Sequence, residues 1–176
     1  MLHRLSRKAV LIGSLLFVSM MFTIVMFVVN PMIDGENGFG VIALQLSFHK
    51  EAGVEIIQNW GASGILNFKK WIFTDYLYAL SYALFLASLL SWLIVKKGKE
   101  KNPSYTRVVY LPFCAGLLDG IENTMELFFI NNPADFSSLV FFLHSIIASL
   151  KWGAVPVAFF YIVLLLSKND KDDVTL

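Results

Sequence analysis

The sequence contains little cysteine, little histidine and little charge. Its 176 residues include one cysteine and three histidines, and 15% of them are charged, with a formal net charge of +1. A single cysteine, Cys114, excludes an intrachain disulfide, a thioredoxin-like pair and a cysteine-rich metal cluster. Its apolar neighbours favour the role of a small buried hydrophobic residue. The near-zero net charge and the lack of an extended basic stripe give no indication of a nucleic-acid partner.

Apolar residues are abundant. They make up 57% of the chain, against about 45–50% in soluble domains, and the mean hydropathy is +0.66. A helix that crosses a bilayer needs about 20 mostly apolar residues. Four such runs occur at about residues 9–29, 71–95, 106–130 and 138–166, with an outer loop at 30–70. The sequence therefore predicts an all-α fold: a four-transmembrane-helix bundle that forms a single integral membrane domain over residues 1–176.

The distribution of Lys and Arg predicts the orientation of this bundle. Basic residues precede the first run and crowd the short link between the second and third runs, whereas the link at 131–137 has none. Cytoplasmic loops carry the excess of Lys and Arg. The chain is therefore expected in the cell membrane as a multi-pass protein, in contact with lipid, with both termini cytoplasmic. The basic residues in question are Arg4, Arg7, Lys8, Lys96, Lys97, Lys99, Lys101 and Arg107.

The outer loop contains a second helical pattern. Ser47 is a candidate cap for a helix at about 48–59, with apolar residues on one side, and Gly61-Ala62-Ser63-Gly64 ends the pattern. We expect a short amphipathic extracytoplasmic helix between spans one and two, lying across the outer mouth of the bundle. The segment at 41–48 is apolar and short, so its pattern does not distinguish a strand from a buried helix.

Polar side chains recur at helical spacing inside three of the four runs. Offsets of three, four and seven residues place them on one face of each helix, and polar groups inside a membrane normally face the bundle interior. The sequence therefore predicts a polar funnel, open outward and closed inward by apolar residues, with Asp75 and Glu126 nearest the outer rim. Its candidate binding residues are Asp75, Tyr78, Tyr82, Asp119, Glu122, Asn123, Glu126, His144 and Lys151.

The charges in this set do not balance. Four carboxyl groups face one lysine, Lys151, and one histidine, His144. Like charges in a medium of low dielectric cannot all stay ionised, so either protons or a bound cation must compensate them. We expect Asp119 to keep its charge opposite Lys151 and Glu122 to carry a proton near neutral pH. The alternative interpretations are a purely structural Asp119–Lys151 pair, and rim positions in water for Asp75 and Glu126.

Short motifs accompany these residues: Trp60-Gly61, Asp75-Tyr76, Asp119-x-x-Glu122-Asn123 and Lys151-Trp152. With them the chain resembles a widespread, functionally unassigned group of small bacterial membrane proteins with four spans, over about residues 41–160. Tyr76 departs from the aliphatic residue that is more usual after the aspartate in that group. The resemblance implies the four-helix membrane fold and the same polar core, and it assigns no reaction.

Three functions are compatible with the pattern. The first is a funnel that binds a small cationic or amphipathic ligand, a cation or a proton. The second is a lipid-modifying enzyme that uses carboxylate acid–base chemistry, with Glu122, Asp119 and Tyr78 as candidate catalytic residues. The third is a structural or assembly partner of another membrane protein, or an oligomer. No metal or cofactor is expected, because a zinc site usually needs several histidines and His144 is the one histidine within a span.

The orientation can be tested by cysteine labelling. In a Cys114→Ala background, a cysteine at Asn132 should react with an impermeant thiol reagent added to intact cells, whereas a cysteine at Lys99 should not. The reason is that the link at 131–137 is expected outside and the basic link inside. The opposite labelling pattern would reverse the predicted topology.

Overall fold

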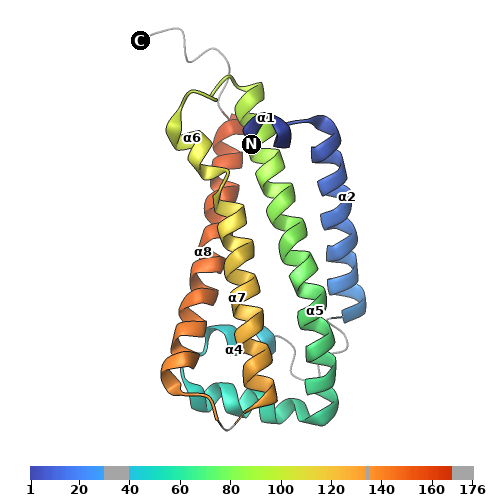
Figure 1. The fold of residues 1–176 in the computed structure, drawn as a ribbon, viewed down its shortest axis with the longest axis vertical. Coiled ribbons are helices and arrows are strands. Elements are labelled where there is room, and N and C mark those ends of the chain that lie inside the picture. The colour runs from blue at the N-terminus through green and yellow to red at the C-terminus, as the bar shows by residue number, and fades with distance from the viewer. Residues whose placement is uncertain (30–39, 134, 168–176) are drawn as a thin grey trace.

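The computed structural model describes residues 1–29, 40–133 and 135–167, and each element of regular structure in these ranges is a helix (Figure 1). The all-α prediction is therefore confirmed for the described part of the chain. The elements are α1 (Leu2–Leu5), α2 (Lys8–Ile24), η1 (Val25–Val29), α4 (Gly40–Leu46), α5 (Lys50–Lys96), α6 (Pro103–Val108), α7 (Leu111–Asn131) and α8 (Ser138–Ser167).

Three helical stretches are long and apolar enough to cross a membrane: Lys8–Val29, Lys50–Lys96 and Ser138–Ser167. The 21-residue helix α7 is less apolar because it carries Asp119, Glu122 and Glu126. It packs along both α5 and α8, and α2 packs against α5 (Figure 1). The acidic helix thus lies against two of the long helices.

One end of the bundle is covered by a helix that runs across it. This crossing helix is the first part of α5, which changes direction at a kink. Gly61 has φ 61° and ψ −174° there, and these angles interrupt the helical path. Glycine adopts such a positive φ without a steric penalty. Residues 50–60 consequently lie across the end of the bundle, and the rest of α5 runs along it (Figure 1).

The segment before α5 resolves one ambiguity and differs from one expectation. The stretch at 41–48, for which strand and helix were both open, is helical over most of its length, as α4. Ser47 does not cap the next helix: its hydroxyl donates to the carbonyl oxygen of Leu44 at 3.2 Å. His49 precedes the first residue of α5 in an extended conformation and makes no side-chain cap.

Two apolar clusters fill the bundle above and below the polar residues. The first lies near the crossing helix and includes Leu44, Ile57, Phe68, Phe129, Phe136 and Phe141. The second lies toward the other end and includes Leu86, Leu90, Leu93, Tyr105, Val108 and Ile162. The sequence predicted apolar closure of one half, and in the structure aromatic rings also close the end near the crossing helix.

The interpretation of Cys114 as a buried residue is wrong, because its side chain is exposed. Cys114 precedes Ala115, which is fully buried on the inward face of α7. Successive residues of a helix point about 100° apart, so the cysteine is turned away from the core. An apolar run cannot show this, since lipid-facing and core-facing residues have the same character.

The crossing helix fits closely against α8 at Gly53. A Cβ atom at this position would lie well inside contact distance of the buried ring of Phe141. We therefore expect Gly53→Ala to destabilise the protein by about 1–3 kcal/mol, the usual cost of overpacking. Thermal unfolding in detergent, followed by circular dichroism, would measure the change.

Gly13→Ala is the matched control. A Cβ at Gly13 meets no atom within 4 Å, and alanine favours a helix over glycine by about 1 kcal/mol. This variant should unfold at the wild-type temperature or above it. Equal effects of the two substitutions would show that the contact between the crossing helix and α8 is not tight.

Candidate functional site

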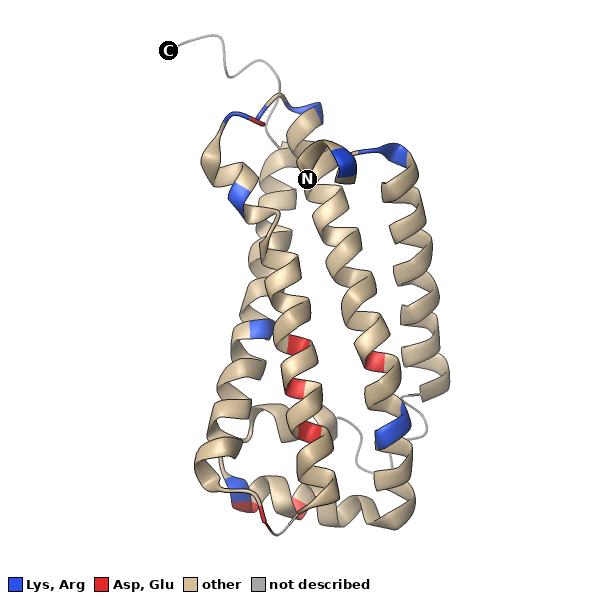
Figure 2. Cartoon of the chain, in the orientation of Figure 1, with Lys and Arg blue, Asp and Glu red and all other residues tan. Residues whose placement is uncertain are grey.

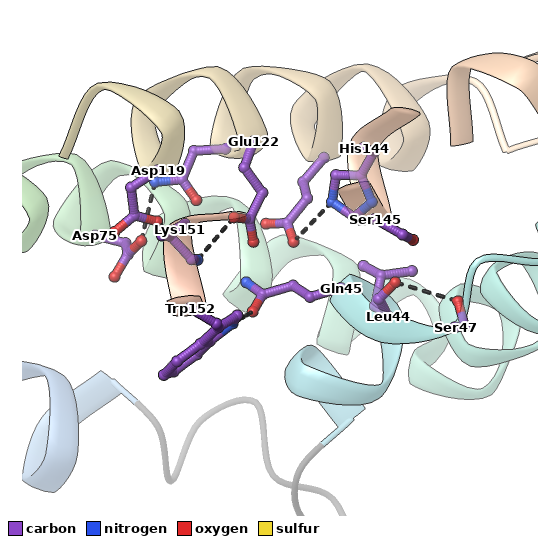
Figure 3. A network of polar contacts seen from close by, with 12 residues as sticks. Leu44, Gln45, Ser47, Asp75, Asp119, Glu122, His144, Ser145, Lys151 and Trp152 are labelled. Atoms are coloured by element: carbon purple, nitrogen blue, oxygen red, sulfur yellow. Dashed lines mark hydrogen bonds and ion pairs between the residues drawn. The ribbon is translucent and has the colours of Figure 1, made fainter. Parts of the chain in front are cut away.

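Lys151 on α8 joins two carboxylates of α7. Its Nζ lies 3.0 Å from Oδ1 of Asp119 and 2.7 Å from Oε2 of Glu122 (Figure 3). The two acidic residues are three positions apart and share one face of the helix. The predicted Asp119–Lys151 pair is confirmed. The second contact differs from the expectation, because the lysine also serves the carboxyl that was expected to hold a proton.

Helix α5 contributes two further polar partners. The hydroxyl of Tyr82 donates to Oδ2 of Asp119 at 2.9 Å, so that each oxygen of this carboxylate has a partner. Asn123 Nδ2 donates to Oδ2 of Asp75 at 2.9 Å. Asp75 is 6% exposed, and the interpretation that it lies in water at a rim is therefore wrong.

Glu126 and His144 form a second pair, nearer the crossing helix. Nε2 of His144 lies 3.5 Å from Oε1 of Glu126, and both side chains are fully buried. The imidazole packs against the rings of Phe129 and Phe141, at centroid distances of 5.2 and 5.6 Å. The rim interpretation is wrong for Glu126 too, because its side chain is fully buried beside an imidazole that aromatic rings cover.

Tyr78 stands apart from this network. Its ring packs edge-on against that of Tyr82, with centroids 5.7 Å apart. The Tyr78 side chain is partly exposed, and within the described ranges its hydroxyl forms no hydrogen bond. The predicted Tyr78 therefore lies next to the site but is not tied to the carboxylates.

Residues that sequence reasoning missed belong to the same region. Nε1 of Trp152 donates to Oε1 of Gln45 at 3.1 Å (Figure 3), and Gln45 is 2% exposed. The side-chain amide of Gln45 also lies beside the carboxyl of Glu126. The hydroxyl of Ser145 accepts a bond from the backbone N–H of Phe48 at 3.2 Å. These contacts attach α4 and the turn after it to the bundle. The sequence pattern did not single out Gln45, because it lies in the stretch at 41–48, for which strand and helix could not be distinguished.

The predicted funnel is an enclosed core in this structure. Its members Glu122, Asn123, Glu126 and His144 have no exposed surface, and apolar clusters lie on both sides. Asp119, Glu122 and Glu126 of α7 and Asp75 of α5 are buried. Most Lys and Arg gather at the end that holds the N terminus, and fewer occur along the bundle and at the opposite end (Figure 2). A cavity of about 270 Å³ lies at that basic end, lined by Met1, Leu2, Thr106, Arg107, Val109 and Tyr110, and includes none of the predicted site residues.

Several polar atoms of the core form no hydrogen bond of good geometry among the described residues. They include Oε1 of Glu122, both carboxylate oxygens of Glu126 and both ring nitrogens of His144. Buried polar atoms are nearly always satisfied in proteins, and each unsatisfied one costs about 1–3 kcal/mol. Oδ1 of Asn123, whose amide nitrogen donates to Asp75, is unsatisfied as well.

No family model, curated protein or solved structure matches the chain. The resemblance to the four-span bacterial group therefore depends on the short motifs. Three of the motifs contribute residues to the core: Asp75, Asp119, Glu122, Asn123 and Lys151.

The three-residue contact around Lys151 makes a quantitative prediction. Lys151→Met should leave two carboxylates without their cation and destabilise the bundle, by about 3–5 kcal/mol if the pair behaves as in soluble proteins. Lys70→Met, at an exposed position of α5, should have little effect. Thermal unfolding in lipid nanodiscs provides the measurement.

Double-mutant cycles separate the two contacts. Lys151→Met should show a coupling energy both with Asp119→Asn and with Glu122→Gln, since its Nζ touches both carboxylates. Additive losses with Glu122→Gln, alongside coupling to Asp119→Asn, would mean that the lysine serves Asp119 alone.

Proposed function

We propose that this chain is a four-span integral membrane protein, with both termini cytoplasmic, whose core binds a cation in exchange for protons. Support for the four spans comes from the three long apolar helices and from the position of α7 between α5 and α8. The carboxylates of α7 point into the bundle, so their polarity does not prevent this helix from crossing a membrane. The basic end of the molecule agrees with a cytoplasmic side.

The observation that carries the proposal is the excess of carboxylates in the core. Asp75, Asp119, Glu122 and Glu126 are all buried, and one lysine, Lys151, is buried with them. That lysine is shared by Asp119 and Glu122, which leaves Glu126 and Asp75 beside neutral side chains or an imidazole. An uncompensated carboxylate is costly in such a place. Protons or a cation must therefore supply the missing positive charge.

A small occupant fits this core better than an amphipathic ligand. The polar groups are enclosed between two apolar clusters, and the aromatic rings of Phe129 and Phe141 lie directly on His144. A lipid-sized or drug-sized molecule would need these elements to separate. An ion or a proton requires no space beyond that around the carboxylates themselves.

The two other functions have less support. Acid–base catalysis on a lipid was expected to use Glu122, Asp119 and Tyr78, but Lys151 holds both carboxylates and Tyr78 lies outside the hydrogen-bond network. An assembly role needs the polar face to be turned toward another protein. The polar groups of α5, α7 and α8 are turned toward one another within the chain.

Infrared spectroscopy tests the exchange of protons for a cation. The ion-free protein in lipid should show the C=O stretch of a protonated carboxyl at neutral pH, because one lysine cannot neutralise four enclosed carboxylates. Glu126→Gln should weaken this band, since no lysine contacts Glu126 among the residues that the structure describes. Titration with a cation that binds should weaken it in the unmodified protein.

Glu51→Gln serves as the control, because Glu51 is exposed on the crossing helix and lies outside the enclosed core. This variant should keep the band. A spectrum without a protonated carboxyl that also fails to change with any added cation would mean that the core is a fixed ion network, and would refute the proposal.

A further inference from the structure

Three side chains in the core are arranged as metal ligands. Glu122 and Glu126 lie one turn apart on α7. His144 comes from α8 and lies 3.5 Å from Glu126; Figure 3 shows it beside the helix that carries Glu122. Each offers one ligand atom, and these atoms all lie within 4.8 Å of one another. All three residues are fully buried. They hold these positions without help from the exposed loops, since each comes from the interior of a long helix.

Most of the unsatisfied buried side-chain atoms in the described ranges belong to these three residues. Lys151 occupies Oε2 of Glu122, whereas Oε1 of the same carboxylate has no hydrogen-bond partner in the described ranges. Both oxygens of Glu126 and both nitrogens of His144 likewise form no hydrogen bond of good geometry. Gln45 lies beside Glu126, but its amide is neutral and supplies no charge.

Glu122 can therefore contact the lysine through one oxygen and an ion through the other. An ion among these atoms would remove most of the desolvation cost of leaving them unpaired. The amide of Gln45 would then support the Glu126 carboxylate from outside the ligand group, as hydrogen-bonding neighbours of metal ligands commonly do.

We propose that Glu122, Glu126 and His144 bind a divalent first-row transition metal ion such as Zn²⁺, an inference that rests on the proposed cation-binding function and specifies the cation. Ligand atoms held tetrahedrally at about 2.0–2.2 Å from an ion are about 3.3–3.6 Å apart, so ligand atoms that now lie within 4.8 Å of one another would have to approach by at most about 1.5 Å. The imidazole makes the site selective. Mg²⁺ and Ca²⁺ take oxygen ligands, whereas zinc, iron and copper accept nitrogen.

The charge of the core agrees with a divalent ion. With a neutral imidazole, the four carboxylates and Lys151 leave three uncompensated negative charges. A divalent ion reduces this to one, on the side where Asn123 already donates a hydrogen bond to Asp75. Neutral histidine and ionised carboxylates are also the forms that bind metals.

Cobalt is a suitable probe because Co²⁺ absorbs visible light when bound by protein ligands. The full-length protein, with any affinity tag removed, would be treated with chelator in lipid nanodiscs and titrated with CoCl₂. We expect d–d absorption bands that saturate at one ion per chain, that Zn²⁺ abolishes and that Mg²⁺ leaves unchanged. His144→Gln and Glu126→Gln should weaken binding by more than about 100-fold, since even outer-shell partners are worth about 10–100-fold.

His49→Gln and Glu51→Gln are the matched controls, because both residues are exposed; they should bind cobalt as the unmodified protein does. If the core variants do not fold, pulsed electron paramagnetic resonance of Mn²⁺ in the unmodified protein gives a separate test, in which coupling to an imidazole nitrogen is expected. Absence of that coupling, absence of binding, or equal binding by core and control variants would overturn the metal site.

The infrared experiment separates this proposal from the broader one. A protonated-carboxyl band that responds to Na⁺ or another cation, in a protein that binds neither Co²⁺ nor Zn²⁺, would refute the metal site and leave the cation-binding core intact. A band that responds to no cation would refute both.

Discussion

The ammonium group of Lys151 determines how the three polar helices fit together. It contacts Asp119 and Glu122 at once, and Asp119 in turn accepts a hydrogen bond from Tyr82. One side chain on α8 therefore fixes the register of α7, and through α7 that of α5. Sliding either helix by a turn would separate a buried charge from its partner, which in an apolar medium is strongly unfavourable.

The helical faces of this core were predictable from sequence, and the reason is physical. Polar groups in an apolar helix have few places to go, so the spacing of Asp119, Glu122 and Glu126 sufficed to place them on one inward face. The pairing of Lys151 with Asp119 followed from their matching depth. Such inferences need only the geometry of a single helix and the cost of burying charge.

The depth and surroundings of the site were not predictable in the same way. The depths of Asp75 and Glu126 follow in sequence from their distance to the ends of their apolar runs, which places both residues near water. In the structure a crossing helix and the ring of Phe141 cover that end. The path of this helix depends on the backbone angles at Gly61. Gln45 reaches the core because α4 packs on α8, a tertiary contact that has no periodic signature.

The ligand-like arrangement of the two glutamates and His144 also depends on tertiary structure. The small number of histidines argues against a metal site in the sequence. Metal motifs are recognised there from several ligands spaced along one segment. Here one ligand comes from a different helix, and its position relative to the glutamates is set by the contact of Lys151 with α7. Composition cannot show this, whereas the packing of two helices does.

The close fit between Gly53 and Phe141 has a mechanical consequence. Phe141 and His144 are three residues apart on α8, and both rings touch Phe129. The crossing helix therefore touches, at Gly53, a group of packed rings that includes the imidazole. A displacement of residues 50–60 toward α8 would therefore press on the ring of Phe141 and, through it, on the imidazole beside Glu126; a shift of His144 would act on the crossing helix along the same path.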